Sequence, residues 1–457
     1  MKPKERMAIH RQKAPELPVE VRIKNFDEVT GGYDEKTAMT EAERCLQCKK
    51  PGCRTGCPLH NNIPEFIRLL REGEIEKAYW TVRETSPMPA ICSRVCPHEM
   101  QCEGGCIRGK KGEPVAIGML ERYIVDWMVA NNKEMMTPCA MPKNKKVALV
   151  GSGPAGMSAA YYLAHEGYSC TVFDCLPVLG GMLTVGIPAY RLPRDIIKAE
   201  MDALKSCGVE FVPNTTIGKD KTLQDLKDEG FEAVLLGVGA HVSRKLGIPG
   251  EDLDGVLHGI DYLRKVNLGE DVDIGKRVVV VGGGNVAIDV ARTALRMGST
   301  DVFILYRRTK KEMPAAQAEI HHLEEEGVKI EFLAAPVEIH GKNGRLNKIE
   351  CIRMKLGECD TSGRCRPVPI EGSNFMIEAD AIIPAISQMV GHTAEQGLNV
   401  ETEKWGTFKV NPDTLQTSVP WIFAAGDDVL GPQTVAKAAY QGKIAARSIS
   451  AFLQGNL

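Results

Sequence analysis

The sequence lacks the long apolar run that a membrane-spanning helix needs. Its longest apolar stretches, such as AVLLGVGA at residues 233–240, fall far short of the ~20 residues that such a helix requires. The N-terminus, MKPKERMAIHRQK, carries charge but no apolar segment, which argues against a secretory signal. A formal net charge of −2 gives no indication of binding to nucleic acid or to an anionic membrane. These absences predict a cytoplasmic protein.

Cysteine is plentiful and unevenly distributed along the 457 residues. Eight of the fifteen cysteines lie between Cys45 and Cys106, and the other seven are scattered. Disulfide frameworks are typical of small secreted domains, so these eight are better explained as metal or cluster ligands. The length predicts two or three domains. The hydrophobic share of 43% and the charged share of 25% are those of a soluble globular protein.

Residues 145–174, KKVALVGSGPAGMSAAYYLAHEGYSCTVFD, predict a strand, a glycine turn, a helix and a second strand. In this pattern Gly151 allows the tight turn, and Gly153 lets the backbone approach a pyrophosphate at the helix N-terminus. An acidic residue that ends the second strand is well placed to bind a ribose hydroxyl. The alternative is a purely structural glycine turn. We predict a dinucleotide site with contacts from Gly151, Gly153, Pro154, Ala155, Gly156 and Asp174.

A second unit of this kind follows at residues 275–308, GKRVVVVGGGNVAIDVARTALRMGSTDVFILYRR. Where an acidic residue would end its second strand, the sequence has two arginines. A carboxylate there would repel a 2′-phosphate, whereas Arg307 and Arg308 can pair with one. A solvated basic turn is the alternative. We predict an NADP(H) site with contacts from Gly282, Gly284, Asn285, Val286, Ala287, Arg307 and Arg308.

Two nucleotide folds in one chain suggest a flavin and a nicotinamide that meet face to face. We assign FAD to the first site because AAGDD, residues 424–428, offers a second acidic contact and is followed by a helix. The positive end of that helix would face the flavin pyrimidine. Hydride transfer needs positioning rather than an acid–base pair, so we nominate no catalytic residue. The additional predicted FAD contacts are Gly426, Asp427, Gln433, Thr434 and Val435.

The N-terminal cysteines form two sets, CLQCKKPGCRTGCP at residues 45–58 and ICSRVCPHEMQCEGGC at residues 91–106. Zinc sites usually have two CxxC pairs separated by a dozen or more residues. Three ligands in a tight run and a fourth before proline are more typical of ferredoxin-type clusters. Clusters are therefore favoured over zinc, and both over disulfides. The remaining cysteines form no CxxC, and we expect Cys359 and Cys365 to be thiols.

The chain resembles the small (β) subunit family of NADPH-dependent glutamate synthase. This family includes the larger subunit of electron-bifurcating NADH-dependent ferredoxin:NADP oxidoreductase, and it is similar to the N-terminal part of dihydropyrimidine dehydrogenase. The motifs that carry the resemblance extend over nearly the whole chain. Besides those above, they are AIGMLERY, GGMLTVGIPAYRLPRDII and YRRTKKEMPA. Within the second of these we expect Gly181 and Arg191 to contact the cofactors.

The resemblance implies two [4Fe–4S] clusters with interleaved ligands. One cluster would be held by Cys45, Cys48, Cys53 and Cys106, and the other by Cys57, Cys96, Cys102 and a non-cysteine ligand. That fourth ligand would be Glu121, for which a carboxylate on a surface helix is the alternative. Cys92 is then left without an assigned role. Two positions depart from the family, since Ser387 stands where Gly is common and Val238 where Thr is frequent.

We therefore expect an α/β fold with two Rossmann-like nucleotide-binding domains of the glutathione-reductase type, preceded by an α-helical iron–sulfur domain. The expected helical domain, binding two [4Fe–4S] clusters, covers residues 1–142. The first part of the FAD domain covers 143–245, the NADP(H) domain 246–374, and the second part of the FAD domain 375–457.

The resemblance implies an electron-transfer flavoprotein that oxidises NADPH, or reduces NADP, at FAD and relays electrons through the clusters to a partner. The partner would be a glutamate synthase large subunit or, alternatively, a ferredoxin-reductase-like flavoprotein in a bifurcating transhydrogenase, possibly with ferredoxin. We thus expect a hetero-oligomer. A disulfide reductase is disfavoured because no CxxC follows GSGPAG. A non-enzymatic sensor subunit is a further alternative.

Overall fold

The computed structural model describes residues 1–361, 363–391 and 400–457. Its N-terminal part is helical, and α5 shows why. Ile63, Phe66, Ile67 and Leu70 recur at intervals of three and four residues and are all buried. The helices of this part are α1 (Pro3–Ala8), α2 (Val19–Arg22), α3 (Glu35–Glu43), α4 (Gly52–Gly56), α5 (Ile63–Arg71), α6 (Ile75–Arg83), α7 (Pro89–Val95) and α8 (Ile117–Ala130).

The first nucleotide-binding unit is built on a five-stranded parallel sheet with the order β15-β4-β1-β2-β3. Its strands are β1 (Lys146–Val150), β2 (Ser169–Phe173), β3 (Glu210–Val212), β4 (Phe231–Leu236) and β15 (Ile422–Ala424). Valine and leucine dominate because helices cover both faces of such a sheet. These helices are α9 (Pro154–His165), α10 (Met182–Val185), α11 (Arg194–Ser206), α12 (Leu223–Asp228), α16 (Asp427–Leu430) and α17 (Val435–Leu453).

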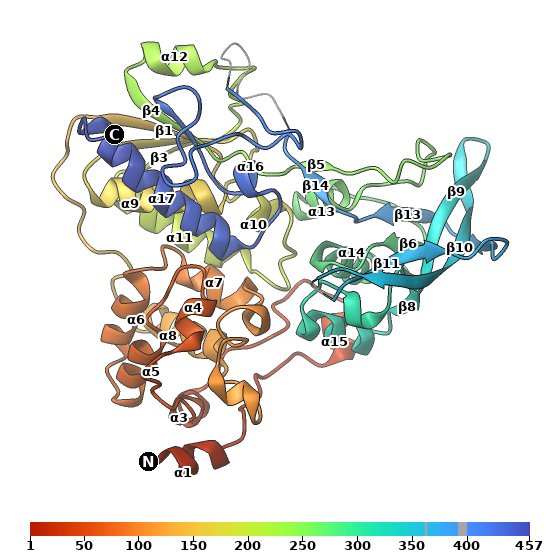
Figure 1. The fold of residues 1–457 in the computed structure, drawn as a ribbon, viewed down its shortest axis with the longest axis horizontal. Coiled ribbons are helices and arrows are strands. Elements are labelled where there is room, and N and C mark those ends of the chain that lie inside the picture. The colour runs from red at the N-terminus through yellow and green to blue at the C-terminus, as the bar shows by residue number, and fades with distance from the viewer. Residues whose placement is uncertain (362, 392–399) are drawn as a thin grey trace.

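The second unit has its own parallel sheet with the order β13-β6-β7-β8. Its strands are β6 (Arg277–Val281), β7 (Asp301–Tyr306), β8 (Lys329–Phe332) and β13 (Ala381–Pro384), and its helices are α13 (Gly259–Asn267), α14 (Asn285–Arg296) and α15 (Gln317–Glu325). An antiparallel sheet extends from it, formed by β9 (Ala334–Lys342), β10 (Arg345–Cys359), β11 (Cys365–Pro369) and β12 (Phe375–Glu378). Figure 1 shows this unit beside the first one.

The chain passes between the two units through a short antiparallel pair, β5 (Val242–Ser243) and β14 (Gln388–Met389). The second unit is therefore inserted into the first. The expected limit at residue 374 is too early, because β13 pairs with β6 of the second sheet. We propose that the boundary lies at β14 instead. The α/β class, with two Rossmann-like units after a helical domain, is as predicted.

The helical part and the first unit share one hydrophobic core, which includes Ile91 of α7, Ala159 of α9 and Ile449 of α17. A buried ion pair crosses this boundary, with Arg83 Nη1 of α6 3.0 Å from Glu200 Oε2 of α11. The second unit has separate cores. In the part of the chain that the structure describes, no helix is long and apolar enough to cross a membrane.

Candidate functional site

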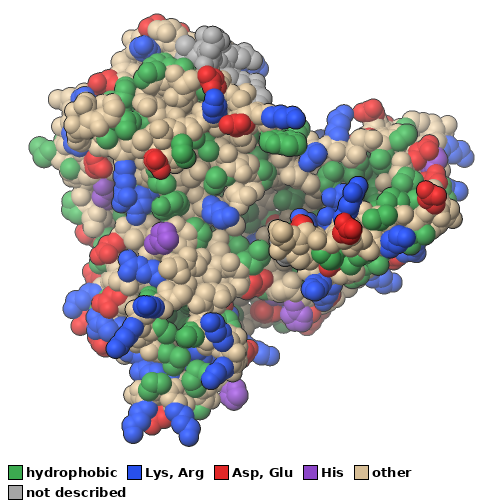
Figure 2. All heavy atoms as spheres, viewed as in Figure 1, with side chains coloured by type: hydrophobic (Ala, Val, Ile, Leu, Met, Phe, Trp, Pro, Cys, Tyr) green, Lys and Arg blue, Asp and Glu red, His purple; other side chains and the backbone are tan. Residues whose placement is uncertain are grey.

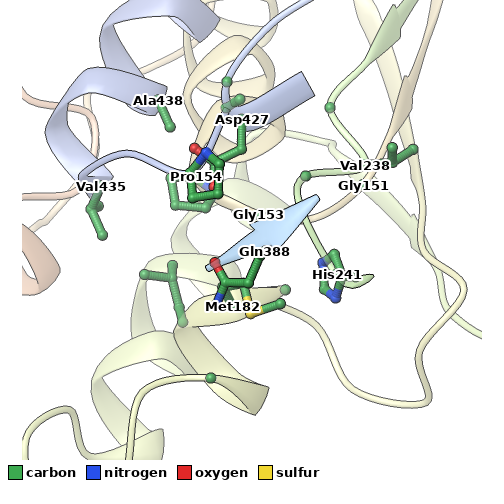
Figure 3. Close-up of a pocket in the computed structure, with 18 of the residues that line it drawn as sticks. Gly151, Gly153, Pro154, Met182, Val238, His241, Gln388, Asp427, Val435 and Ala438 are labelled. Carbon is green, nitrogen blue, oxygen red and sulfur yellow. The ribbon is translucent and has the colours of Figure 1, made fainter. Parts of the chain in front are cut away.

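A cavity of about 450 Å³ opens at the carboxyl end of the first sheet. Figure 3 shows Gly151, Gly153, Pro154, Asp427 and Val435 around it. These residues come from segments almost 300 positions apart, which the parallel sheet brings together at one edge. Every residue predicted from the first motif and from the C-terminal segment lines this cavity, apart from Gly156.

In the turn after β1, the glycines lie as close to other backbone segments as the motif predicts. Gly151 has φ +107°, and a Cβ added there would lie 2.2 Å from the carbonyl oxygen of Gly237. A Cβ on Gly156 would lie 2.0 Å from the carbonyl oxygen of Gly151. Gly156 therefore allows α9 to pack against the turn and does not line the cavity. At Gly153, by contrast, a Cβ would meet nothing within 4 Å. This open position at the N-terminus of α9 suits a pyrophosphate.

Three carboxylates line the cavity, and two of them, Asp174 and Asp427, were predicted from the sequence. Asp174 is buried and accepts hydrogen bonds from the amide of Ser152, at 2.8 Å, and from the amide of Leu176, at 2.9 Å. Asp427 accepts one from the amide of Gln433, at 3.0 Å, while burial raises its pKa to about 6. Both side chains are therefore held in fixed positions at the cavity.

Thr434 links the cavity to the helical part. It is the residue before α17, and no side chain caps the amides at this helix end. Its hydroxyl oxygen accepts a hydrogen bond of 3.1 Å from Gln101 Nε2, which lies between the cysteines of the second set. The positive end of α17 thus faces the cavity, as the sequence predicted for the helix near Gln433.

Arg191 lines the cavity, but both of its ion pairs are with the second unit. Its Nη1 lies 2.7 Å from Asp289 Oδ2 of α14, and its Nε lies 3.0 Å from Glu319 Oε1 of α15. Burial raises the pKa of Asp289 to about 6, against the lowering effect of Arg191. Arg191 therefore contributes to the junction between the two units, a role that the sequence did not indicate.

The second glycine motif is also tightly packed. Gly282 has φ +147°, and a Cβ there would lie 2.4 Å from the carbonyl oxygen of Ala385. Gly284 immediately precedes α14, and Ala287 is fully buried beneath the turn. Asn285 and Val286, the first residues of α14, reach the cavity described above. The second motif therefore meets the first at a shared wall.

Arg307 and Arg308 follow β7, outside this cavity. Arg308 Nε donates a hydrogen bond of 2.8 Å to the carbonyl oxygen of Cys365. The pKa of Arg307 is lowered, first by burial and then by the charges of Arg308, Arg364 and Arg244. Sequence reasoning missed Arg244 and Arg364, because each comes from a segment remote from the motif.

Two further side chains of the cavity were missed. Figure 3 shows His241, which follows the first sheet, and Gln388 of β14. Burial, with the charge of Arg264, lowers the pKa of His241 to about 4, so this ring is neutral at pH 7. Ser387, beside Gln388, has φ +144°, a conformation that favours the glycine common in the family. The departure at this position thus introduces backbone strain next to the cavity.

Four cysteines from both stretches, Cys45, Cys48, Cys53 and Cys106, surround a small cavity of about 30 Å³. These four are the first cysteine set. Two glycines allow the loops to approach, since a Cβ on Gly52 would lie 2.4 Å from the carbonyl oxygen of Gly105. Burial, with the neighbouring Cys45 and Cys106, raises the pKa of Cys53 to about 12. Four thiols around one space suit a cluster that binds thiolates.

Cys57, Cys96 and Cys102 each interact electrostatically with Glu121 of α8, and we call these three cysteines the second cysteine set. Glu121 is 6% exposed, and its Oε1 is buried without a hydrogen-bond partner among the described residues. Burial raises its pKa to about 8. The alternative of a surface carboxylate is therefore wrong, because α8 turns this side chain inward. An unpartnered buried carboxylate beside three thiols fits a metal cluster. Cys92 contacts Cys96 and so lies next to this set.

Two other cysteine pairs are disulfide-bonded in the structure, Cys139 with Cys207 and Cys359 with Cys365. The expectation that Cys359 and Cys365 are thiols is wrong. The antiparallel register of β10 and β11 places these two residues directly opposite each other. Neither pair lines the large cavity or the small one.

Comparison with known protein families agrees with this arrangement. Residues 22–133 match the family described as dihydropyrimidine dehydrogenase domain II, 4Fe–4S cluster. Residues 145–442 match the pyridine nucleotide-disulphide oxidoreductase family. Among solved structures, FprA of Mycobacterium tuberculosis in complex with NADPH has a TM-score of 0.58 and 21% identity, over 68% of this chain and 85% of that one. At this identity the likeness shows the fold alone.

Curated relatives are more similar in sequence. The β subunit of an NADP(+)-dependent formate dehydrogenase from Moorella thermoacetica is 42% identical over 88% of this chain and 60% of the relative. The β subunit of an NADPH-Fe(3+) oxidoreductase from Geobacter sulfurreducens is 41% identical over 88% and 63%. The chain thus spans about 60% of the length of these relatives.

The glutamate synthase [NADPH] small chain of Escherichia coli is 35% identical over 98% of both chains. That of Azospirillum brasilense is 36% identical over 95% of this chain and 93% of the relative. Such coverage includes the helical part and both nucleotide-binding units. The chain therefore belongs to the glutamate synthase small chain family, with a domain of the 4Fe–4S cluster type followed by domains of the pyridine nucleotide-disulphide oxidoreductase type.

Proposed function

We propose that this chain is the NADP(H)-dependent subunit of a larger redox complex. It oxidises NADPH, or reduces NADP, at FAD and exchanges electrons with a partner subunit through two [4Fe–4S] clusters. When bound, FAD converts between a two-electron hydride and single electrons, and iron–sulfur clusters carry single electrons. The residues of this chain bind and orient these groups.

One observation carries the proposal, namely that the large cavity has two different neighbours. On one side Asn285 and Val286 begin the helix of the second glycine motif. On the other side the wall includes Val95 and Pro97, which flank Cys96 of the second cysteine set. A flavin in this cavity would lie between the nicotinamide and a cluster, as a relay requires.

For the first nucleotide we propose FAD, with its pyrophosphate at Gly153 and the N-terminus of α9 and its ribose at Asp174. Asp427 and the amide end of α17 would orient the flavin. For the second we propose NADP(H), with Gly282 and Gly284 at its pyrophosphate and Arg307 and Arg308 at the 2′-phosphate. Positioning of the two rings is sufficient for hydride transfer.

For the clusters we propose the two sets that lie together in the fold. Cys45, Cys48, Cys53 and Cys106 would hold the cluster nearer to solvent, because three of these side chains are partly exposed. Cys57, Cys96, Cys102 and Glu121 would hold the one nearer to the flavin cavity. Burial by itself favours the protonated thiols, but the cysteines must be thiolates to ligate iron. The positive charge of the irons favours this ionisation.

A disulfide reductase would need two redox cysteines at the flavin. Among the described residues that line the cavity, the one cysteine is Cys175, which follows Asp174. The residue after it is Leu176, and no second cysteine is among the described residues that line the cavity. The geometry therefore supports electron transfer through clusters rather than through a dithiol.

The partner is proposed from the relatives, which are named as β subunits or small chains. Our first choice is a glutamate synthase large chain, because the small chains match this chain over nearly their whole length. The test is anaerobic purification of the complex from its native source, followed by identification of the chain that co-elutes. A large glutamine-processing chain would support this choice. A ferredoxin-reductase-like flavoprotein would instead indicate a bifurcating transhydrogenase, and a chain that elutes alone would contradict both.

A further inference from the structure

We propose that Cys139, Cys207 and His165 bind a zinc ion in the reduced protein. These residues come from three separate segments, namely the linker between α8 and β1, the residue after α11 and the end of α9. Their ligand atoms, two Sγ and one ring nitrogen, lie within 4.8 Å of one another. Tetrahedral zinc ligands, at about 2.0–2.3 Å from the ion, lie roughly 3.5–3.8 Å from each other. Small side-chain movements therefore suffice to bring the three atoms onto one ion.

Hydrogen bonds hold the imidazole of His165 in the orientation of a metal ligand. Its Nδ1 donates to the carbonyl oxygen of Tyr161, one turn earlier in α9, at 2.7 Å. In the neutral ring Nε2 then carries a lone pair, which accepts a hydrogen bond of 3.0 Å from Thr137 Oγ1. The ring also packs on that of Tyr161, with centroids 4.3 Å apart. Metal-binding histidines are commonly fixed in this way, because the bond from the other nitrogen selects the tautomer.

Two helix ends favour a cation at this position. His165 is the last residue of α9, a helix of 12 residues, and Cys207 directly follows α11, a helix of 13 residues. The carbonyl groups at the end of an α-helix carry partial negative charge, which stabilises a nearby cation. A divalent ion would therefore compensate the two thiolates and the two helix ends together.

The linker is held where it supplies Cys139. The amide of Ala140 donates a hydrogen bond of 3.1 Å to the carbonyl oxygen of His165. A Cβ on Gly167 would lie 2.2 Å from the carbonyl oxygen of Met141, so a glycine is needed for this approach of the linker to the end of α9. The backbone thus places Cys139 beside His165 without help from the side chains.

The site is accessible to solvent. Figure 1 shows the linker as a loop along the outer side of the molecule, at the left of the view. In the same view, Figure 2 shows charged and histidine side chains at the surface of that side. Each of the three proposed ligands is partly exposed. An ion from solvent therefore has access to the site, and a water molecule would supply the fourth position of a tetrahedral zinc ion.

Cys139 and Cys207 are joined as a disulfide in the structure, and the zinc-bound form is the alternative state of the same pair. Reduction by a dithiol transfers two electrons and two protons to the pair, which becomes two thiols while the dithiol becomes a disulfide. Zn²⁺ then displaces these two protons. The proposed clusters need thiolate ligands, so this chain works where thiols stay reduced, and this step rests on the proposed function. Two thiolates with an imidazole are a ligand set that suits zinc.

The metal would join the linker to the first nucleotide-binding unit next to the helical part. Cys207 ends the same helix, α11, whose Glu200 pairs with Arg83 of α6 at 3.0 Å. The chain leaves the helical part through the linker that carries Cys139. Zinc would therefore fix the covalent connection between these two parts close to the ion pair that already joins them.

The test is metal analysis of the holoprotein, purified anaerobically with a phosphine reductant that keeps thiols reduced. The wild-type protein should retain about one zinc per chain in addition to its iron. Competition for Zn²⁺ with a chromophoric chelator then gives the affinity. Cys139→Ser and His165→Ala should each weaken binding at least about tenfold, because loss of a ligand costs no less than loss of a group that supports one.

Two control variants match these changes. Cys359→Ser with Cys365→Ser removes the other cysteine pair that is joined in the structure, which belongs to no group of three possible ligands among the described residues. His321→Ala removes an exposed imidazole from α15. Both variants should retain the zinc of the wild-type protein.

Three outcomes would overturn the zinc site: a wild-type protein that contains iron but no zinc, equal zinc affinity in the wild-type protein and both ligand variants, or equal losses in the ligand and control variants. If His165→Ala does not fold, Cys139→Ser decides, because Cys139 lies in the partly exposed linker. Iron and flavin are measured on the same samples. Their absence from a wild-type protein that binds zinc would contradict the proposed function and not the zinc site.

Discussion

Arg191 and Asp289 form a buried ion pair, 2.7 Å between Nη1 and Oδ2, that joins the two Rossmann-like units beside the large cavity. Arg191 belongs to the loop before α11 of the first unit, and Asp289 to α14 of the second. Glu319 of α15 adds a second contact to Arg191, at 3.0 Å. The relative position of the two units, and with it the distance between the two proposed nucleotide sites, is therefore fixed by charged side chains in a buried junction.

Replacement of Arg191 by methionine should destabilise this junction strongly. It leaves Asp289 and Glu319 without their partner, and removal of one member of a buried ion pair typically costs about 3–5 kcal/mol. Chemical denaturation should show this loss, and stopped-flow measurements should show slower reduction of the flavin by NADPH. The control is Arg277→Met, whose ion pair with Asp301 is half-exposed, so its removal should hardly change the free energy of unfolding. Equal losses in the two variants would contradict the assignment.

Removal of both arginines after β7 should change the choice of nicotinamide cofactor. In the variant with Arg307→Ala and Arg308→Ala, the loss of charge-assisted contacts of ~1.5–3 kcal/mol should raise the KM for NADPH roughly ten- to hundredfold. The KM for NADH should change little, because NADH has no 2′-phosphate. Arg366→Ala, an exposed neighbour on β11, is the control and should leave both constants unchanged. Equal increases for NADPH and NADH would remove the basis for NADP(H) at this site.

Glu121→Ala should alter one cluster and spare the other. The substitution removes the carboxylate that would ligate iron and leaves no oxygen that could replace it. Electron paramagnetic resonance of the reduced protein should therefore show one changed signal and one unchanged signal. Cys92→Ser, a substitution beside the same set, should preserve both signals, since Cys92 is not among the proposed ligands. An unchanged spectrum of Glu121→Ala would show that the carboxylate is not a ligand.

The stability of the FAD-free protein should depend on the protonation of Asp427. Burial raises the pKa of this carboxyl from 3.8 to about 6, so the folded chain keeps a proton that the unfolded chain releases above pH 4. The free energy of unfolding should fall as the pH rises from about 4 to 6, by up to ~3 kcal/mol, and then level off. In Asp427→Asn this component should be absent. The difference between the two proteins, measured by urea denaturation across this range, isolates the effect, and a constant difference would contradict it.

The parts of the site that the sequence predicted are those set by local chain geometry. Gly151 and Gly282 adopt positive φ because each turn passes within a van der Waals contact of another backbone segment. The short spacing of the cysteines marked the two cysteine-rich stretches, but the grouping of Cys106 with Cys45, Cys48 and Cys53 was given only by the family resemblance. Glu121 could be placed at the second set only through the family resemblance.

The contributions that escaped prediction depend on tertiary packing. The sequence around Arg191 does not indicate that its partner lies on α14. Arg244 and Arg364 approach Arg307 from segments that are distant in the sequence. The limit of the inserted unit was misplaced because β13 joins its sheet only after the antiparallel excursion from β9 to β12. Likewise, the pairing of Cys359 with Cys365 follows from the register of β10 and β11, which composition does not reveal.

We propose that a flavin between NADP(H) and two clusters connects these groups for electron transfer. The most direct measurement is iron and flavin analysis of the anaerobically prepared protein, followed by rapid mixing with NADPH. Two [4Fe–4S] clusters predict about eight iron atoms per FAD, with loss of flavin absorbance followed by loss of cluster absorbance. About four iron atoms per FAD, or clusters that stay oxidised while the flavin is reduced, would contradict the claim.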